Sequence, residues 1–368
     1  MMPRAPMIGT STHHNRWVAL DYWRGLMALA VMAFHFDKWT TGVWDGSTAQ
    51  GKLGVYAVSI FFMLSGMALT ETYQKKLQPH WQSLFSYVLR RVFRIFPLLW
   101  AATGLTLLLD EIRRSPRDIL LNLSGLFGFI DPSKDIATGA WSIGCELVFY
   151  ALFPILVLMH RKKRWFIHAC VILMAFIGMT RAFGGPFAIQ GESQSLWWSY
   201  YVQVPNHAFF FVTGMSLAIH RNWLQQVPRR IWWFLLIGGA AVFLWVPVGV
   251  NPVGLVRGWP RMALSALAVL VTTAWSFGIG TLQDIPHKLL AWLGSISYSI
   301  YLLHPLVYRA TKACFTRFSD FPPNVLLPIA CAATLLAGHA VYYFFEKPIM
   351  LALRPINRAN AWTPTGQQ

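Results

Sequence analysis

Long runs of apolar residues recur along the whole chain, and each could cross the hydrocarbon core of a bilayer, which takes about 20 residues of helix. The chain has 368 residues, of which 55% are hydrophobic and only 12% are charged. That charged fraction is about half of what a soluble domain carries. We therefore predict an all-α polytopic membrane protein with about ten transmembrane helices around a polar central cavity. The runs lie near 17–37, 53–71, 88–109, 141–160, 165–181, 196–219, 231–250, 262–281, 288–308 and 324–344.

These runs leave no segment that is long or polar enough for a second soluble domain. Residues 1–16 are predicted to be a disordered cytoplasmic N-terminus, residues 17–345 one membrane domain, and residues 346–368 a short cytoplasmic tail. No small-residue cleavage site follows a short apolar core, so no signal peptide is predicted. The four cysteines have neither metal-ligand spacing nor a disulfide pattern, so no metal site is predicted.

The formal net charge of +17 would suggest nucleic-acid binding in a soluble protein. Here the basic residues lie in short loops between apolar runs, where the positive-inside rule accounts for many of them. No nucleic-acid partner is therefore predicted, and membrane lipid is the expected surrounding. If the N-terminus is cytoplasmic, clusters such as Lys75–Lys76 and Arg161–Arg164 fall on the cytoplasmic side. The prediction is a bacterial-type inner-membrane protein with both termini in the cytoplasm.

The first apolar run contains Arg24 and His35. An ionisable group inside a membrane helix is energetically costly and by default marks a functional site. Eleven residues at about 100° each bring both side chains to nearly the same helix face, about 16 Å apart along the axis. One helix thus offers a fixed cation and, towards its outer end, a group that can transfer protons.

On the cytoplasmic side, Arg91 and Arg94 begin the third run at the depth of Arg24. Residues three apart share a helix face, and paired guanidinium groups suit phosphate groups with several oxygens. A phosphate-bearing donor substrate is therefore predicted to bind on this side.

On the outer side, His35 falls at a depth similar to that of Glu146 and His304. Histidine suits general-base catalysis because its pKa lies near neutral pH. Glu146 is predicted to orient the imidazole of His35 and to stabilise its protonated form. Trp141 and Ser142, at the start of the same run as Glu146, are predicted to line the cavity. A hydroxyl acceptor would meet the donor there.

Six segments carry a resemblance to a known family. They are Arg24-Gly25 with His35, Phe61-Phe62-Met63-Leu64-Ser65-Gly66, Arg91-Val92-Phe93-Arg94-Ile95-Phe96-Pro97, Trp141-Ser142 with Glu146, Ser297-Tyr298-Ser299-Ile300-Tyr301-Leu302-Leu303-His304-Pro305, and Phe345-Glu346-Lys347-Pro348. In this order, across nearly the whole chain, they resemble the integral-membrane acyltransferase family 3, which includes O-acetylases of O-antigen, exopolysaccharide and other cell-surface glycans.

The resemblance implies ten core helices and acyl-coenzyme A, usually acetyl-coenzyme A, as a co-substrate and not a tightly bound cofactor. It also implies that His35 is the essential histidine, that Arg24 is its functional partner, and that Arg91 and Arg94 engage the donor. Some relatives append a soluble domain after the membrane core. This chain is expected to be the stand-alone form, which leaves open the need for a separate partner.

The predicted function is acyl transfer from acyl-coenzyme A to a hydroxyl of a glycan, with His35 as general base. The acceptor would be an exopolysaccharide, a lipopolysaccharide sugar, a lipid-linked sugar or a small metabolite. One alternative is a transporter or flippase for a lipid-linked sugar, which would usually contain an internal repeat, and the chain has none that we detect. A subunit of a polysaccharide export complex is a second alternative, and it predicts no dependence on coenzyme A.

Each candidate residue also has a structural interpretation. His35 would be hydrogen-bonded by a neighbouring helix. Arg24 would pair with Asp21 one turn away. Arg91 and Arg94 would anchor the end of a helix at the membrane interface.

The remaining candidates have similar alternatives. Glu146 would bind backbone amides, and His304 would cap or pack locally. Tyr298 and Tyr301, three apart on one face, are further candidates for the cavity wall. Cys145 is a candidate nucleophile for a covalent acyl relay, an alternative to direct transfer.

Overall fold

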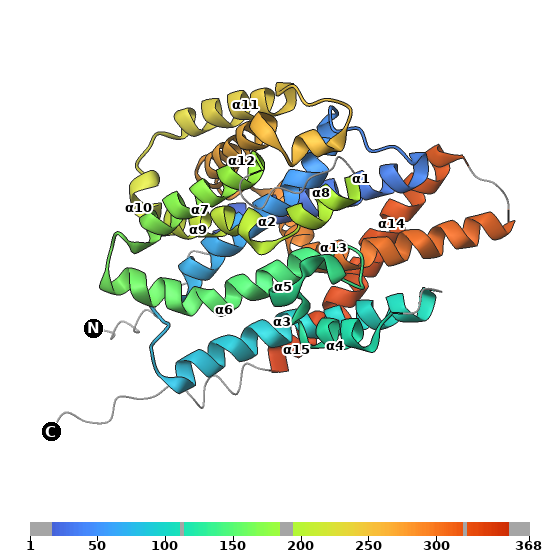
Figure 1. The fold of residues 1–368 in the computed structure, drawn as a ribbon, viewed down its shortest axis with the longest axis horizontal. Coiled ribbons are helices and arrows are strands. Elements are labelled where there is room, and N and C mark those ends of the chain that lie inside the picture. Colours follow the sequence, from blue (N-terminus) through green and yellow to red (C-terminus); the bar gives the residue numbers. More distant parts are fainter. Residues whose placement is uncertain (1–16, 111–113, 185–193, 319–321, 353–368) are drawn as a thin grey trace, which may run out of the picture.

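The structure is a computed structural model and describes residues 17–110, 114–184, 194–318 and 322–352. The predicted disordered N-terminus and the end of the predicted tail lie outside these residues. Every regular element in the described part of the chain is helical, as predicted (Figure 1). In order, the elements are α1 (Val18–Thr41), α2 (Ala49–Tyr73), α3 (Trp81–Leu109), α4 (Pro116–Ser124), α5 (Phe127–Ile130), the 3₁₀ helix η1 (Pro132–Lys134), α6 (Trp141–Lys162), α7 (Phe166–Ala182), α8 (Gln194–Tyr201), η2 (Val204–Asn206), α9 (Ala208–Ile219), α10 (Arg221–Leu224), α11 (Arg229–Trp245), η3 (Pro252–Leu255), α12 (Gly258–Gly278), α13 (Asp284–Phe318), α14 (Pro323–Val341), the π-helix η4 (Tyr342–Glu346) and α15 (Lys347–Ala352).

Six of the described helices are long and apolar enough to cross a membrane. They are α2, α3, α6, α12, α13 and the continuous segment Val325–Ala352. Helices α7 and α9 are apolar but shorter, and α1 is not among the six because Asp21, Arg24 and His35 lower its hydropathy. The coarse prediction of a multi-pass membrane protein is confirmed, whereas the number of about ten spans stays a prediction.

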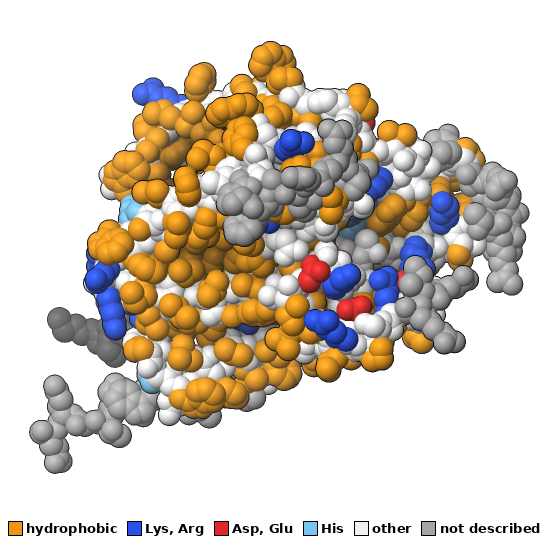
Figure 2. All heavy atoms as spheres, in the orientation of Figure 1, with side chains coloured by type: hydrophobic (Ala, Val, Ile, Leu, Met, Phe, Trp, Pro, Cys, Tyr) orange, Lys and Arg blue, Asp and Glu red, His pale blue; other side chains and the backbone are white. Residues whose placement is uncertain are grey.

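The outer surface of the bundle is apolar around its middle (Figure 2). Lys and Arg side chains gather at the left edge of this view, and a mixed group of acidic and basic side chains lies at the lower right. Large apolar residues on three different helices point outward, including Leu108 on α3, Phe176 on α7 and Phe234 on α11. Such a surface is unfavourable in water and matches the hydrocarbon of a bilayer.

Helix α1 lies between α2 and α13 and makes extensive contacts with both. The contact with α13 is close because each of the two helices has a glycine at the contact, Gly25 on α1 and Gly294 on α13. A Cβ atom on Gly25 would lie 2.7 Å from Cβ of Leu293, and one on Gly294 would lie 2.3 Å from the Asp21 carbonyl oxygen. Small residues let membrane helices approach closely, so these glycines hold the polar face of α1 against α13.

The prediction of one continuous span at 196–219 is wrong. The chain is helical in α8, breaks, and resumes as α9. Pro205 lies in the break and has no amide hydrogen to donate. Side chains satisfy the freed backbone, since the Asn206 amide donates to the Tyr200 carbonyl at 2.6 Å and the His207 ring contacts the Tyr201 carbonyl at 2.9 Å.

Helical structure continues past residue 345, the predicted end of the membrane domain, and that boundary stays a prediction. Helix α14 continues through the π-helix η4 into α15, which ends at Ala352. Glu346 in η4 is buried and accepts a hydrogen bond from Ser299 on α13. The wider turn of a π-helix often occurs at functional sites, and here it also places Tyr342 in the wall of a cavity.

Candidate active site

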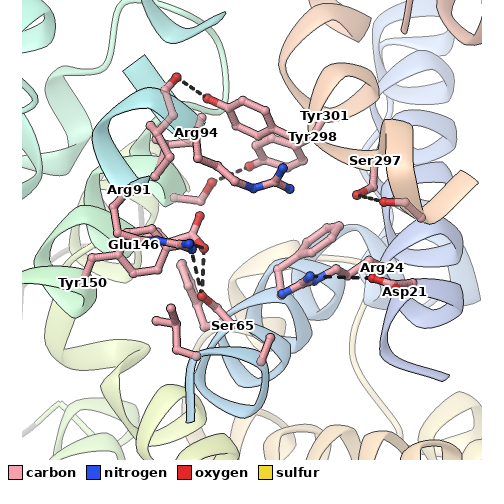
Figure 3. A pocket seen from close by; sticks show the side chains of 18 of the residues that line it. Asp21, Arg24, Ser65, Arg91, Arg94, Glu146, Tyr150, Ser297, Tyr298 and Tyr301 are labelled. Atoms are coloured by element: carbon pink, nitrogen blue, oxygen red, sulfur yellow. Dashed lines mark hydrogen bonds and ion pairs between the residues drawn. The ribbon is translucent and has the colours of Figure 1, made fainter. Parts of the chain in front are cut away.

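A cavity of about 310 Å³, the first cavity, lies among α1, α2, α3, α6 and α13 (Figure 3). Residues from distant parts of the chain meet here because α1 packs between α2 and α13 while α3 and α6 flank them. The predicted site residues in its wall are Arg24, Arg91, Arg94, Ser142, Glu146, Tyr298 and Tyr301. The structure thus brings together the three arginines that the sequence assigned to one depth.

Among the residues that the structure describes, no carboxylate forms a close ion pair with any of the three guanidinium groups of this cavity. Arg24 lies 4.0 Å from Asp21 and donates to the Leu64 carbonyl at 3.4 Å. Arg91 lies over an aromatic ring, 5.5 Å from the centroid of Tyr150. Arg94 donates a hydrogen bond to the sulfur of Met350 at 3.4 Å. Weakly paired guanidinium groups around one cavity favour the binding of an anion.

Glu146 lies in the first cavity and not beside His35. Its carboxylate accepts hydrogen bonds from Ser65 on α2, at 2.8 Å, and from Tyr150 one turn further along α6. The prediction that Glu146 orients the His35 imidazole is therefore wrong. Glu146 lies five positions after Trp141, the first residue of α6, and this rise along the axis carries it away from the end at which His35 lies.

His35 lies in a second cavity of about 520 Å³. Four tryptophans line its wall, together with two basic side chains and one acidic side chain. The lining residues that matter here are Lys38, Trp39, Trp44, Arg114, Asp135, Trp141 and Trp198. Lys38 lies 4.5 Å above the ring of Trp44. Of the predicted site residues, His35 and Trp141 line this cavity.

The partner of His35 is His304 on α13. Nδ1 of His35 lies 2.8 Å from Nε2 of His304, and His304 is only 1% exposed. The two imidazoles come from helices that the sequence separates by 269 positions, yet the close α1–α13 contact brings them together. His304 therefore belongs to the site as the neighbour of the candidate base, although it lines neither cavity wall.

Hydrogen bonds join residues that line the two cavities, and we call this group of residues, Gly139, Ser142 and Tyr301, the partition. The Tyr301 hydroxyl donates to the Gly139 carbonyl at 3.0 Å and lies 2.7 Å from Oγ of Ser142. Ser142 and Tyr301 line the first cavity, whereas Gly139 and Trp141 line the second. The hydroxyl of Tyr301 thus joins α13 to the start of α6 at the boundary between the cavities.

Cys145, the candidate nucleophile, lines neither cavity. Cys145 is buried, and its sulfur contacts the Val202 carbonyl at 3.2 Å. All four cysteines are free. The geometry therefore gives no support to Cys145 as an acyl carrier.

Asp135 lies in the segment before α6, outside the membrane-spanning helices. One of its carboxylate oxygens accepts a hydrogen bond from the Trp141 amide at 3.1 Å. It therefore satisfies an amide at the start of α6 that has no partner within the helix. Burial raises the pKa of the Asp135 carboxyl from 3.8 to about 7, although backbone amides that donate to it oppose this shift.

This raised pKa predicts a pH dependence of stability. Between about pH 4 and 7 the folded protein binds a proton at Asp135 that the unfolded chain has released. Stability falls with rising pH where the folded state binds more protons, so this group should lower the free energy of unfolding by up to about 1.4 kcal/mol per pH unit. Thermal unfolding across this window should show a falling midpoint, and Asp135→Asn should flatten it. Equal slopes in both proteins would contradict the raised pKa.

Several lining residues were not predicted, although local signals existed for some. Trp39 is one turn from His35, and Tyr150 is one turn from Glu146, so helical spacing places each beside a candidate residue. Asp135, Trp44 and Trp198 lie outside the runs that contain the motifs. Only their tertiary contacts bring them to the site.

Comparison with known proteins gives the family. A family described as an acyltransferase domain matches residues 17–343. The chain is 25% identical to the peptidoglycan O-acetyltransferase OatA of Listeria monocytogenes over 92% of this chain and 57% of that protein. It is 25% identical to the acyltransferase MdmB of Streptomyces mycarofaciens over 83% of this chain and 84% of that protein. No solved structure matches it. Because the family match covers most of the chain and all six motif segments but the last, the chain belongs to acyltransferase family 3, the membrane family that its motifs resemble.

Proposed function

We propose that this protein transfers an acyl group, in the simplest case acetyl, from acyl-coenzyme A to a hydroxyl of a cell-surface or exported glycan. One observation carries the proposal: three arginines line one cavity, a histidine lines a second, and hydrogen-bonded residues connect the walls of the two. One cavity suits a phosphate-bearing donor, and the other suits a hydroxyl acceptor and its base.

The donor would bind in the first cavity. Coenzyme A carries several phosphate groups, and Arg24, Arg91 and Arg94 offer guanidinium forks for them. The helical rise from Arg24 to His35 is about 16 Å, which an extended pantetheine arm can span. The thioester would then reach the partition at Tyr301, from which the acyl group meets the second cavity.

The acceptor would bind in the second cavity. Pyranose rings have C–H groups that pack on the electron-rich faces of aromatic rings, and Trp39, Trp44, Trp141 and Trp198 line this space. The listeria relative is named as a peptidoglycan O-acetyltransferase, which supports a glycan as the acceptor class.

The chemistry uses His35 as a general base. Its imidazole takes the proton from the acceptor hydroxyl while the hydroxyl oxygen forms a bond with the thioester carbonyl carbon. The carbon–sulfur bond breaks, and the imidazolium returns the proton to the leaving thiolate. The products are an ester and free coenzyme A, so no external oxidant, metal or carrier enters the balance.

The topology completes the proposal. We place both termini and the first cavity on the cytoplasmic side of a bacterial inner membrane, with the second cavity on the outer side. Helices α1, α7, α9 and α11 would also cross the bilayer, which with the six long apolar helices makes ten spans around the two cavities.

The test is transfer of label. Inverted membrane vesicles that contain the protein are incubated with acetyl-coenzyme A labelled in the acetyl group. We expect label in glycan or lipid-linked sugar, and none in vesicles without the protein. Substrate accumulation without covalent label would instead indicate a transporter.

Tyr301→Phe tests the partition. This change keeps the ring but removes the contacts of its hydroxyl with Gly139 and Ser142. Water from the second cavity should then reach the thioester more often, so we expect the ratio of acyl-coenzyme A hydrolysis to acyl transfer to rise several-fold. The matched control is Tyr298→Phe, because Tyr298 lines the same cavity but donates to the Ile95 carbonyl. An unchanged ratio in Tyr301→Phe would contradict the role of the partition.

A further inference from the structure

The surroundings of His304 decide which of its ring nitrogens carries a proton. Nδ1 lies 3.2 Å from the Ile300 carbonyl oxygen, and the Tyr301 carbonyl makes a second backbone contact with the ring. Pro305 cannot donate an amide hydrogen to the Tyr301 carbonyl, which leaves that oxygen free to accept from a side chain. A carbonyl oxygen only accepts hydrogen bonds, so Nδ1 of His304 must be the donor.

The proton on Nδ1 leaves Nε2 of neutral His304 as an acceptor. Nε2 lies 2.8 Å from Nδ1 of His35. The ring centroids are 5.0 Å apart and the planes differ by only 10°, a separation close to the N···N distance plus two ring radii. The imidazoles therefore lie edge to edge in nearly one plane, which is the geometry of a linear hydrogen bond.

This contact fixes the protonation of His35 in turn. Nδ1 of His35 must donate to His304, so Nε2 of neutral His35 keeps its lone pair. Nε2 makes no hydrogen bond to any residue that the structure describes, and His35 lines the second cavity. The unprotonated nitrogen is thus the one available to a hydroxyl in that cavity.

We propose that His304 is a positioning residue that holds His35 in the tautomer with a proton on Nδ1 and a lone pair on Nε2. The inference rests on the proposed role of His35 as base. The same contact also stabilises the imidazolium that forms when His35 takes a proton, because its Nδ1–H then becomes a charge-assisted donor. A purely structural role for His304 would hold α1 against α13 without selecting a tautomer.

The tautomer is measured directly by solid-state ¹⁵N NMR of the ¹⁵N-histidine-labelled protein in lipid bilayers, above the ordinary histidine pKa of about 6.5. The chain has 11 histidines, and a difference spectrum against His35→Asn identifies the His35 signals. We expect a protonated Nδ1 and an unprotonated Nε2. In His304→Phe, which removes the acceptor but keeps a ring, the population should move towards a protonated Nε2. A wild-type His35 with a protonated Nε2, or identical His35 signals in both proteins, would overturn the proposal.

Kinetics supply the second readout. His304→Phe should lower kcat for acyl transfer about 10- to 100-fold while the KM for acyl-coenzyme A changes less than about twofold, since the first cavity is untouched. In His304→Gln, the side-chain oxygen is as many bonds from Cα as Nε2 and can accept from His35, so part of kcat should return. Equal kcat losses in the Phe and Gln variants, with both folded, would contradict the positioning role.

The two proposals fail separately. If His35→Asn retains full transfer activity, the proposed base is wrong whatever tautomer the spectra report. If His35→Asn is inactive but the wild-type Nε2 is protonated, only the role of His304 is wrong.

Discussion

Loss of the imidazole at position 35 is expected to reduce acyl transfer by about 10²- to 10⁴-fold, the usual contribution of a general base. His35→Asn is the sharper of two variants. Its amide nitrogen lies as many bonds from Cα as Nδ1, so it can still donate to His304 and keep the α1–α13 contact. It has no basic nitrogen to accept the hydroxyl proton. The measurement is the rate of transfer of labelled acetyl groups to glycan by purified protein in vesicles.

The comparison needs proteins of equal stability. His35→Ala removes both the base and the contact, so the two variants together separate catalysis from packing. His168→Ala is the matched control, because His168 is exposed on α7 and lines neither cavity. Its thermal unfolding midpoint and activity should equal those of the wild type. If folded His35→Asn keeps more than a tenth of the activity, His35 is not the base.

Replacement of the arginines of α3 should weaken donor binding. Arg91→Gln and Arg94→Gln each remove a charged donor from the first cavity. A hydrogen bond to a charged group contributes about 1.5–3 kcal/mol, so each variant should raise the Kd for acyl-coenzyme A by about 10- to 100-fold. Isothermal titration of the detergent-solubilised protein with acyl-coenzyme A measures this directly, without dependence on an acceptor.

Arg90→Gln is the control for this series. Arg90 is the neighbour of Arg91 in the chain but does not line the cavity, so the same change of charge on the same helix should alter the Kd less than about threefold. The affinity for dephosphorylated pantetheine derivatives should also be nearly equal in all three variants and in the wild type. Equal weakening by Arg90→Gln would show that the effect is general electrostatics and would refute a specific phosphate site.

Much of the site could be predicted because charge inside a membrane helix is rare. Arg24 and His35 stand out in an apolar run, and the helical period places them on one face without any knowledge of the partner helices. Arg91 and Arg94 follow from the same period. All four line the two cavities, although their roles stay predictions.

The partners of these residues were harder to predict. The sequence suggested Glu146 as the neighbour of His35, because both were assigned to the outer half of the membrane. The approximate depth of a residue in the membrane does not specify the direction in which its side chain points within the bundle. It also leaves an uncertainty of one helical turn along the axis. In the structure Glu146 accepts hydrogen bonds from Ser65 and Tyr150, whereas His35 is hydrogen-bonded to His304. The break at Pro205 was missed for a related reason, since hydropathy averages over a window and does not detect a local interruption.

The sequence by itself determined that this chain is helical and spans a membrane, since apolar runs of bilayer length have no other stable structure in lipid. It also determined which few polar side chains lie within those helices. Only the tertiary structure decided that they divide between two adjoining cavities and that one imidazole faces another. The physical reason is that a helical period sets directions along one helix, whereas the close approach of α1 and α13 at Gly25 and Gly294 depends on how separate helices pack.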